Sequence, residues 1–527
     1  FGSEEQKQKY LPLVATEALS AFALTEPLTG SDAANVRTEA VLDAAGSYFL
    51  VTGEKIWCTN GPIARYVTLI ARVPARRVAR DGQTTWMPVP EGHGADDLVH
   101  TAFILDMSAP GVEVRQRCQF EGCRGIENAH MTMQQVRVPV ENVIGEVGKG
   151  LKYALTILNV GRGISIPAIC LGMAKQAWQP TLDRTNARVT FHKPLAERQT
   201  QQIRIGDMAG HLFAMEALSM LVWRLADQHR YDIRIEAAVA KIFCSEHTIQ
   251  FLRDAQILFG GMGYETAASK MVRGEAAFGI EQLVRDAEMY RIGEGATDIL
   301  RPFIVREGLS HHLDRAKPLY SGELSILDQL RQVLKLGAFY GPWYLRQWIR
   351  RLLPAGPAFA HPQVGPALKY VERTSRRLAR EIFYAMVRFQ GSFQDEQRVQ
   401  NRLESVGEDL LALVATVLYA EQQTRLEGRT TVWELIDAFD VAARQRVRQR
   451  LNEIRRHRNG DRLTAATGVQ ALKGYYPGLS EGIVQRRLDE YRRKQDASEA
   501  RPTALDHLPA QMVGAPVLKT IASDSDG

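Results

Sequence analysis

The feature that most constrains the fold is a change in hydrophobic period near residue 150. Before it, five short stretches carry β-branched runs or apolar–polar alternation typical of strands: 36–42, 48–52, 66–71, 102–107 and 131–138. From Gly150 onward, apolar residues recur at steps of three and four, which is the period of an α-helix. Strands followed by helices predict an α+β protein and not a doubly wound nucleotide-binding fold.

The helical pattern divides into several predicted helices: 153–187 (one or two helices), 197–228, 232–259 and 275–289. A further helix is expected at 3–19, before the strands. Residues 74–97 are polar and rich in Gly and Pro, which predicts an exposed loop. Residues 310–495 are again helical in pattern, with Pro and Gly breaks near 341, 354 and 362.

We therefore expect five regions along the chain. They are a helical remnant at 1–19, a β-domain at 20–145, a helical domain at 146–310, a second helical domain at 311–495 and a disordered tail at 496–527. The chain starts at Phe1 and not at Met, which predicts that it is the middle of a longer protein.

Composition and charge narrow the class of protein without identifying it. The chain has 527 residues, 45% hydrophobic and 24% charged, as expected for a globular protein with large cores. Five scattered cysteines favour a reducing compartment. No uninterrupted run of about 18 apolar residues is present, so no membrane-spanning helix is predicted. The net charge of +6 favours anionic partners, which include phosphorylated ligands, lipid surfaces and nucleic acid.

The segment 321–353 has two interpretations of about equal weight. It is basic and amphipathic, and Trp343, Tyr344 and Trp348 lie beside arginines, as in a helix on a membrane surface. A helix packed against the rest of the protein would show the same pattern. The Arg-rich stretch 444–462 is more typical of a solvated helix face than of a nucleic-acid-binding patch.

The strongest candidate for catalysis is Glu294, which lies between Gly293 and Gly295. Helical patterns on both sides predict a tight turn, where glycine permits unusual backbone angles and close approach of a ligand. A carboxylate in an apolar pocket has a raised pKa and can serve as a general base. The alternative for an isolated Glu in a loop is a solvated side chain.

Three other segments have the composition of a ligand site. The loop 21–32 is rich in hydroxyl groups and glycine, which suits a pyrophosphate or the edge of a heterocycle. Trp57 offers a flat ring for stacking, although a buried Trp is the more common outcome. The sharp break at 260–264 could bring the backbone close to a ligand.

Together these segments resemble the acyl-CoA dehydrogenase family, and the very-long-chain branch in particular. The resemblance runs from Phe1 to Leu309, and 310–495 match in helical character and placement. It rests on these motifs in the family's order: Thr25-Glu26-Pro27, Gly30-Ser31-Asp32, Lys55 to Gly61, Val138-Pro139, Arg188 with Phe191, Gly260-Gly261-Met262-Gly263 and Glu294-Gly295. The family's N-terminal helical domain is mostly absent.

The resemblance implies an FAD-dependent oxidation of fatty acyl-CoA to the trans-2-enoyl-CoA, with electrons passed to an electron-transfer flavoprotein. Glu294 would be the catalytic base. It also implies that FAD is bound by Phe22, Leu24, Thr25, Gly30, Ser31, Trp57, Cys58, Thr59, Arg188, Phe191, Gln199, Gly260, Gly261, Thr297 and Asp298. Of these, Arg188 and Phe191 would reach the FAD of the neighbouring subunit of a homodimer, and Thr297 and Asp298 the adenine half. Acyl-CoA would contact Ser31, Asn159, Arg162 and Gly295.

No metal ion and no nucleic acid are expected as partners. For a bacterial source the expected location is the cytoplasm, with peripheral contact of 321–353 with the inner membrane. For a eukaryotic source it is the matrix side of the mitochondrion. Some branches carry the base one residue before the arginine that is Arg162 here, but that position is Gly161.

Four positions depart from the pattern that the resemblance implies. Gly293 replaces an aromatic residue, Ala296 a threonine and His192 a glycine. Ile257 stands where the family has glutamine, and Gln256 lies one place away. Two alternatives to a dehydrogenase therefore stay open: a scaffold or assembly protein with weak turnover, and an acyl-CoA oxidase that passes electrons to oxygen.

Overall fold

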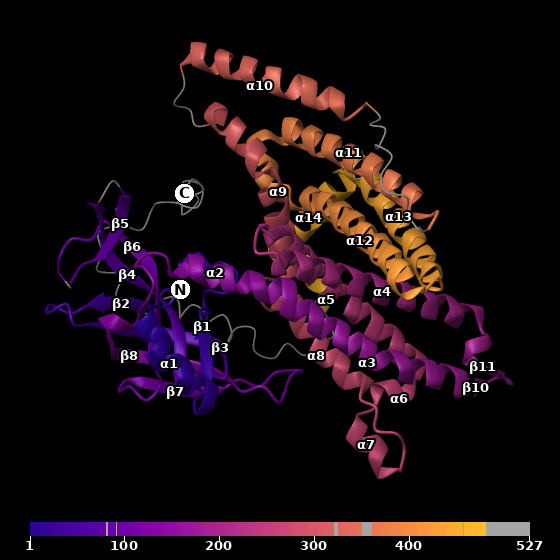
Figure 1. Cartoon of the computed structure of the whole chain (residues 1–527), viewed down its shortest axis with the longest axis horizontal. Helices are drawn as coiled ribbons and strands as arrows, with labels where there is room; N and C mark the ends of the chain where they lie inside the picture. The colour runs from indigo at the N-terminus through magenta and orange to yellow at the C-terminus, as the bar shows by residue number, and fades with distance from the viewer. Residues whose placement is uncertain (81–82, 91, 321–324, 350–360, 457, 481–527) are drawn as a thin grey trace. The chain divides into compact units, whose positions relative to one another are not determined.

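The computed structural model describes residues 1–80, 83–90, 92–320, 325–349, 361–456 and 458–480 (Figure 1). They belong to two compact units. The first comprises 1–117, 128–153 and the described part of 459–527, and the second comprises 118–127 and 154–458. The tail expected at 496–527 lies outside the described residues. The two units are defined by their compactness and do not test the limits of the five predicted regions. Those regions therefore stay predictions.

The first unit is built on a nine-stranded sheet of the order β7-β8-β3-β2-β4-β6-β9, with β1 and β5 also paired to β4. The strands are β1 Ser20–Ala23, β2 Glu39–Leu42, β3 Tyr48–Thr59, β4 Tyr66–Arg80, β5 Gln83–Pro88, β6 Asp97–Asp106, β7 Val112–Arg117, β8 Asn128–Pro139 and β9 Val143–Ile144. All five predicted strands are present. Alternate residues of the long strands, such as Phe49 and Val51 on β3 and Phe103 on β6, form the core.

The prediction of an exposed loop at 74–97 is wrong. β4 continues to Arg80 and pairs antiparallel with β5, and it pairs with β6 as far as Asp97. The strands were not recognised from the sequence, because polar side chains lie on both of their faces. The dipeptide Asp81-Gly82, a common hairpin signal, lies between β4 and β5 in the sequence.

The helix α1 Glu4–Thr16 confirms the helix predicted at the start of the chain. Its N-terminus is a capping box, in which the Ser3 hydroxyl accepts from the Gln6 N–H and the Gln6 side chain accepts from the Ser3 N–H. The Gln6 amide also donates to the carbonyl oxygens of Glu141 (2.7 Å) and Val143 (2.8 Å). These bonds attach α1 to the sheet.

The second unit is helical, which confirms the α+β class. Its elements before residue 300 are α2 Gly150–Val160 (shared with the first unit), a π-helical turn Gly161–Ser165, α3 Ile166–Ala187, the hairpin β10 Val189–Thr190 and β11 Lys193–Pro194, α4 Gln199–Asp227, α5 Arg234–Phe259, α6 Gly261–Tyr264, α7 Ala267–Val272 and α8 Ile280–Ile292. The last predicted helix starts five residues late, at Ile280 and not at 275. The largest core cluster draws buried residues from α3, α4, α5 and α8.

Two stretches are long and apolar enough to cross a membrane when judged by length and composition alone, 150–187 and Gln199–Asp227. Their mean hydropathy is high although polar residues interrupt them, whereas the prediction required an uninterrupted apolar run. Both stretches contribute to the core of the helical unit through fully buried residues such as Ala174 and Leu218. A core helix passes the same test, so the prediction of no spanning helix is left as it was.

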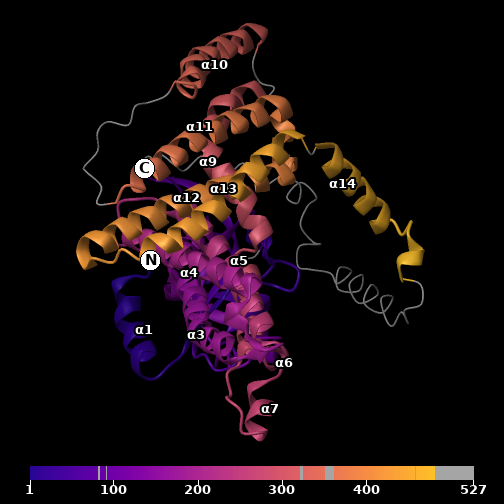
Figure 2. The ribbon, with the colours of Figure 1, turned by 90° about the vertical axis from the view of Figure 1, so that its right-hand side faces the viewer.

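The described residues of 297–458 form the rest of the helical unit (Figures 1 and 2). The helices are α9 Thr297–Tyr320, α10 Ile326–Arg346, α11 Val364–Phe389, α12 Gln397–Glu427 and α13 Val432–Arg456, and α14 Arg458–Leu472 follows. α9 runs unbroken across the boundary expected at 310/311. The break expected near 341 is wrong, because α10 includes Pro342. The break near 362 is confirmed, and that near 354 lies outside the described residues.

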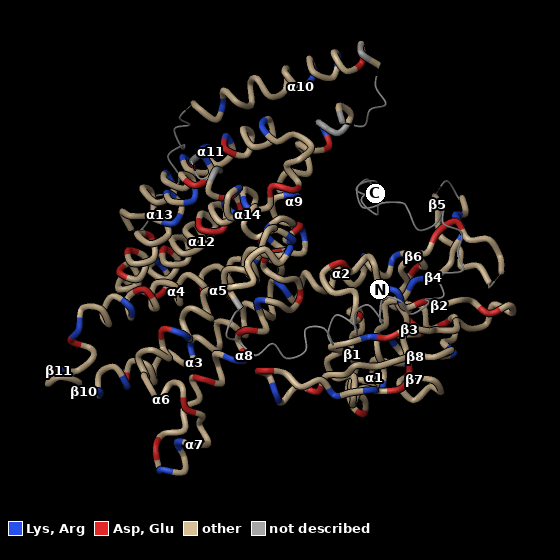
Figure 3. Tube along the Cα trace, turned by 180° about the vertical axis from the view of Figure 1, so that it is seen from behind, with Lys and Arg blue, Asp and Glu red and all other residues tan. Residues whose placement is uncertain are grey.

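Lys and Arg are interspersed with Asp and Glu along α11, α12 and α13 (Figure 3). Several arginines of the stretch 444–462 form ion pairs within the unit. Arg444 lies 2.7 Å from Asp440, Arg450 lies 3.1 Å from Glu453, and Arg446 binds Asp409 at 2.7 Å. Their charges are therefore matched locally and do not make a separate basic stripe.

Candidate functional site

Glu294 lies in the turn between α8 and α9, as predicted. Its φ of 53° is left-handed, a region that costs a non-glycine residue energy and is common at functional sites. Gly295 follows with φ 102°, and a Cβ there would lie 3.0 Å from Leu300 and 3.3 Å from Arg162. Only glycine fits that position without strain. The Glu294-Gly295 pair therefore turns the chain sharply and leaves the carboxylate on one side of the turn.

The structure brings Arg162, Asn159 and Gly161 to this turn from the junction of α2 and the π-helical turn. Arg162 Nε donates to the Glu294 carbonyl oxygen (2.6 Å), and its Nη1 donates to Asn159 Oδ1 (3.1 Å). A Cβ added at Gly161 would lie 3.0 Å from the Glu294 carboxyl carbon and closer to Oε2. Gly161 therefore leaves the space that the carboxylate fills, and the π-helical turn is a common marker of such sites.

Burial raises the pKa of the Glu294 carboxyl, and the charges of Arg162 and then Lys241 oppose that rise. Glu294 as a whole is exposed, but its carboxyl lies against the backbone of Gly161. Burial likewise lowers the pKa of Arg162, which Glu294 counteracts. A carboxylate with a raised pKa that stays accessible from one side can accept a proton from a bound molecule.

Two residues of α5 that the sequence reasoning missed hold the same turn. Lys241 has no exposed surface, and its Nζ donates to the carbonyl oxygens of Arg291 (3.1 Å) and Gly295 (2.8 Å). Glu246 accepts from Arg291 Nε (3.2 Å) and from Thr297 Oγ1 (2.8 Å). The available signal was a lysine within the apolar run 237–244.

In the first unit, a similar arrangement holds the loop after β1. The Lys55 ammonium, also fully buried, binds the Leu24 carbonyl oxygen (3.0 Å) and Glu26 Oε1 (2.8 Å). Glu26 Oε1 also accepts from the N–H (2.9 Å) and hydroxyl (2.7 Å) of Thr38, and the Ile56 N–H donates to the Thr25 carbonyl oxygen (2.9 Å). The loop 24–26 and the strand β3 are thus fixed to each other.

Six predicted FAD contacts surround this loop: Phe22, Thr25, Gly30, Ser31, Trp57 and Thr59. Trp57 is 55% exposed and adopts φ 55°, so its ring is left open on the sheet and fits stacking against a planar cofactor ring. Gly30, Ser31 and Thr59 are exposed. Cys58 and Leu24 are buried, and the Cys58 thiol lies 3.5 Å from the Phe22 carbonyl oxygen.

Of the predicted FAD contacts in the second unit, Thr297 and Asp298 begin α9 directly after the Glu294 turn, and the others lie elsewhere. Arg188 caps the C-terminus of α3, and Phe191, 90% exposed, lies at the tip of the β10–β11 hairpin next to the exposed Gln199. α3 has 22 residues, so about 33 Å separates its ends, and Arg162 lies at the other end. One chain therefore does not bring Arg188 and Phe191 to the Glu294 turn. Gly260 and Gly261 end α5, and Gly260 is left-handed.

Three of the four departures now have a structural context. His192 has φ 61°, so this residue keeps the left-handed backbone that glycine would give. Ile257 is 59% exposed, and the Gln256 amide donates to the Gly263 carbonyl oxygen (3.1 Å), so Gln256 does not replace the missing glutamine. A Cβ at Gly293 would meet only the Met289 carbonyl oxygen, at 3.4 Å. The structure offers no account of Ala296.

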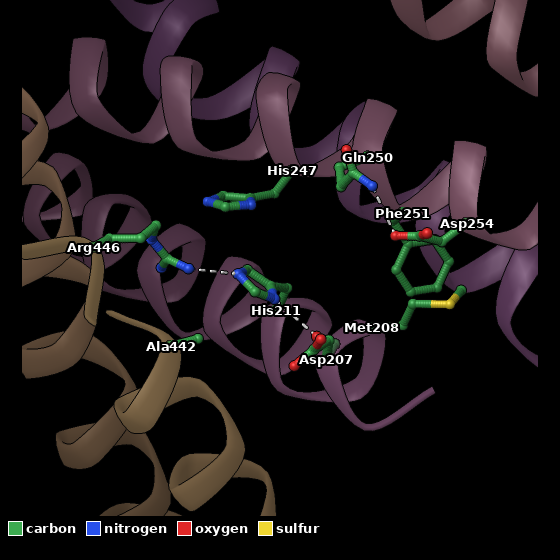
Figure 4. Close-up of a pocket in the computed structure, with 9 residues that line it drawn as sticks. All are labelled: Asp207, Met208, His211, His247, Gln250, Phe251, Asp254, Ala442 and Arg446. Carbon is green, nitrogen blue, oxygen red and sulfur yellow. Dashed lines mark hydrogen bonds between the residues drawn. The ribbon is translucent and has the colours of Figure 1, made fainter. Parts of the chain in front are cut away.

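A separate cavity of about 320 Å³ lies between α4, α5 and α13 and contains none of the predicted site residues (Figure 4). The rings of His211 and His247 lie there with centroids 4.5 Å apart and planes tilted by 35°, and Arg446 contacts His211. Burial is the largest cause that lowers the pKa of both histidines. Among the described residues, no group of three or more His, Cys, Asp or Glu side chains is placed to hold a metal ion.

Comparison with known proteins gives matches to two family models. The acyl-CoA dehydrogenase middle domain matches residues 21–136, and the acyl-CoA dehydrogenase C-terminal domain matches residues 148–309. A probable acyl-CoA dehydrogenase, FadE10 of Mycobacterium tuberculosis, is 35% identical over 92% of this chain and 72% of its own length. The human mitochondrial very long-chain specific acyl-CoA dehydrogenase is 30% identical over 92% of this chain and 69% of its own length.

Among solved structures, the acyl-CoA dehydrogenase of Bacillus anthracis complexed with FAD aligns with a TM-score of 0.66. It is 24% identical and covers 86% of this chain and 72% of its own. This likeness supports the fold, in which a sheet-containing unit and a helical unit occur together.

Proposed function

Because this chain belongs to the acyl-CoA dehydrogenase family, we propose that it oxidises long-chain fatty acyl-CoA to the trans-2-enoyl-CoA, with Glu294 as the base. The family, the oxidoreductase class and the FAD dependence expected from the sequence are confirmed. The observation that carries the proposal is the Glu294 turn, where a carboxylate with a raised pKa is fixed by Arg162 and Lys241.

The chemistry requires loss of the α-proton of the thioester together with the β-hydrogen and its electron pair. FAD, when bound, supplies the two-electron acceptor for this oxidation. The Glu294 carboxylate takes the α-proton, and the Arg162 bond to the Glu294 carbonyl orients it. Because the pKa of Glu294 is raised, the reaction rate should fall with decreasing pH. The fall should occur at a higher pH than with an exposed Glu as the base.

The residues proposed to hold FAD in one subunit are those around the 24–26 loop, with the Trp57 ring on the flavin. Ser31 and Asn159 are proposed to face the acyl-CoA. Arg188 and Phe191 are proposed to serve the FAD of a second copy, because they lie about 33 Å along α3 from Arg162. This assignment requires a homodimer, which light scattering during gel filtration tests directly.

The first experiment is the visible spectrum of the purified protein before and after anaerobic addition of palmitoyl-CoA. We expect flavin absorbance that bleaches in the wild type. In Glu294→Gln, which keeps the shape of the side chain but cannot accept the proton, bound flavin should stay oxidised, with a reduction rate lower by about 10³-fold or more. Bleaching at the wild-type rate in the variant would rule out Glu294 as the base.

The electron acceptor is proposed to be an electron-transfer flavoprotein. Steady-state turnover with that protein as acceptor should greatly exceed turnover in air. Stoichiometric peroxide would instead identify an acyl-CoA oxidase. Protein purified without flavin that fails to bind added FAD would favour the scaffold alternative.

We further propose that α10 contacts an anionic membrane surface. Leu327, Leu330, Val333 and Leu334 form an exposed apolar face, each at least half exposed. Of the aromatic residues in this segment, Trp343 packs against Phe383 with centroids 5.9 Å apart, whereas Trp348 is 57% exposed. The parts of 321–353 outside 325–349 lie outside the described residues. Cytoplasmic or matrix location, depending on the source, stays part of this proposal.

Co-sedimentation with phosphatidylglycerol vesicles at low salt tests the membrane contact. The wild type should sediment with the vesicles, and the double variant Leu330→Ser, Leu334→Ser should not, because it removes two side chains from the apolar face. The matched control is Leu426→Ser on α12, which is 73% exposed and lies outside α10. Equal sedimentation of all three proteins would exclude α10 as the contact.

A further inference from the structure

The Glu294 turn needs a restraint, because it holds two consecutive residues at positive φ. We propose that Lys241 is a positioning residue for the base: its buried ammonium group binds the carbonyl oxygens on both sides of Glu294 and fixes the turn. Its effect on the reaction rests on the function proposed above. Its effect on the turn does not.

The geometry of Lys241 is that of a clamp. Arg291 lies in the last turn of α8, where carbonyl oxygens have no helical partner and a cation is favourable. Gly295 lies just before α9. One ammonium group, 3.1 Å from the first carbonyl oxygen and 2.8 Å from the second, therefore joins the end of one helix to the start of the next. Glu294 lies between the two bonded peptide groups.

The second restraint from α5 supports this role. Glu246 lies five residues further along the helix and binds Arg291 and Thr297, which flank the turn on either side. Both residues of α5 thus connect the same two helix ends. An apolar side chain of the same length at 241 would fill the same space, but it would remove the hydrogen bonds that the ammonium donates to the two carbonyl oxygens.

Electrostatics distinguishes Lys241 from a residue that only fills space. The charged and titratable groups that face it are Glu246 on its own helix, Cys170 on α3, Arg162 on the π-helical turn and Glu294. Burial lowers its pKa to about 8, and Glu246 is the largest opposing influence. The ammonium and Arg162 both favour the ionised form of Glu294. Neutral Lys241 still donates hydrogen bonds, but weaker ones.

The test compares wild type with Lys241→Met, which keeps the length and loses the donors. Hydrogen exchange of peptides covering 288–300 should speed up by roughly tenfold in the variant. Anaerobic reduction of the flavin by palmitoyl-CoA at pH 7 should slow by about 10²-fold, while the Kd for palmitoyl-CoA changes by no more than about threefold. A rate and an exchange pattern equal to those of the wild type would overturn the proposal.

The pH profile of the wild type provides a measurement that needs no variant. The reduction rate should decrease as pH rises through about 8, where Lys241 loses its charge. The Lys241→Met variant should lack this decrease in rate. The Lys241→Arg variant, which stays charged, should shift the decrease to a pH above the range measured. A wild-type profile without a step near pH 8, or a step kept in Lys241→Met, would contradict the assignment.

The matched control for hydrogen exchange is Lys270→Met. Lys270 is 1% exposed, belongs to the same unit, and binds the carbonyl oxygens of Met262 (2.8 Å) and Phe278 (2.6 Å). Its loss should loosen 262–278 and leave 288–300 unchanged. Faster exchange of 288–300 in both variants would mean general loosening and would overturn a specific role for Lys241. If wild type fails to bleach with palmitoyl-CoA, the proposed function fails, while the exchange experiment still decides the clamp.

Discussion

The loop after β1 and the turn before α9 are held in the same way, by a lysine without exposed surface that binds backbone carbonyl oxygens. They differ in the second partner. Lys55 binds a carboxylate, Glu26, at 2.8 Å, whereas Lys241 binds two neutral carbonyl groups. In the first unit the charge is neutralised where it is buried. In the second it stays available to act on Glu294.

This difference suggests that the two lysines have different roles. A hydrogen-bonded buried ion pair fixes geometry and exerts little field beyond itself. An ammonium bound only by carbonyl dipoles fixes geometry and also favours a nearby anion. The proposed base, Glu294, is in the second unit, where the lysine ammonium binds carbonyl oxygens and no carboxylate directly.

The largest expected effect on stability is that of Lys55→Met. It leaves the Glu26 carboxylate buried with only the Thr38 and Arg37 donors, and breaking such a pair costs about 3–5 kcal/mol. Chemical unfolding should show this loss as a lower midpoint. The double variant Lys55→Met, Glu26→Gln should recover part of it. No recovery would mean that the pair does not act as a unit.

The next effect is the pH dependence of stability that Lys241 causes. Its pKa is about 8 in the folded protein, below the ordinary lysine value of 10.5. Between these values the unfolded chain binds a proton that the folded chain does not, so the free energy of unfolding rises with pH across this window. Two and a half pKa units correspond to about 3 kcal/mol, an upper limit.

Unfolding of wild type and Lys241→Met from pH 7 to 10 measures this effect. The difference in stability should change with pH, since only the wild type has the titrating group. A constant difference would show that Lys241 keeps its ordinary pKa and that its charge is screened.

The smallest effect is expected for Thr38→Val. The variant removes the hydroxyl that donates to Glu26 Oε1 but keeps the N–H of Thr38, and such a bond contributes about 1 kcal/mol. The reduction rate of the flavin should stay at the wild-type value, because the ion pair remains. A loss of stability as large as that of Lys55→Met would assign the main restraint to the hydroxyl and not to the ammonium.

The sequence was informative where one residue type is needed for a local reason. The glycine after Glu294 marked the turn, and the structure gives it a φ of 102°, with Leu300 and Arg162 close to where a Cβ would lie. The change of period at 150 separated strands from helices correctly. The hairpin of β4 and β5 was missed, since its strands alternate poorly and were judged by composition.

Other features could not be read from the sequence because they depend on pairing between distant backbone groups. The parallel pairing of β1 with β4 joins strands that are 42 residues or more apart, and no side-chain pattern records it. From the sequence, Gly161 was expected only to show that no second candidate base precedes Arg162. Its missing side chain makes room for Glu294, 133 residues later in the chain.

The sequence by itself determined the α+β class and the family resemblance and pointed to Glu294 as the candidate base, because hydrophobic period, glycine and a flanked carboxylate are local properties. Only the tertiary structure decided which buried lysine holds which loop. A carbonyl oxygen belongs to every residue, so the partners of Lys241 carry no signature until the fold brings Arg291 and Gly295 within hydrogen-bonding distance.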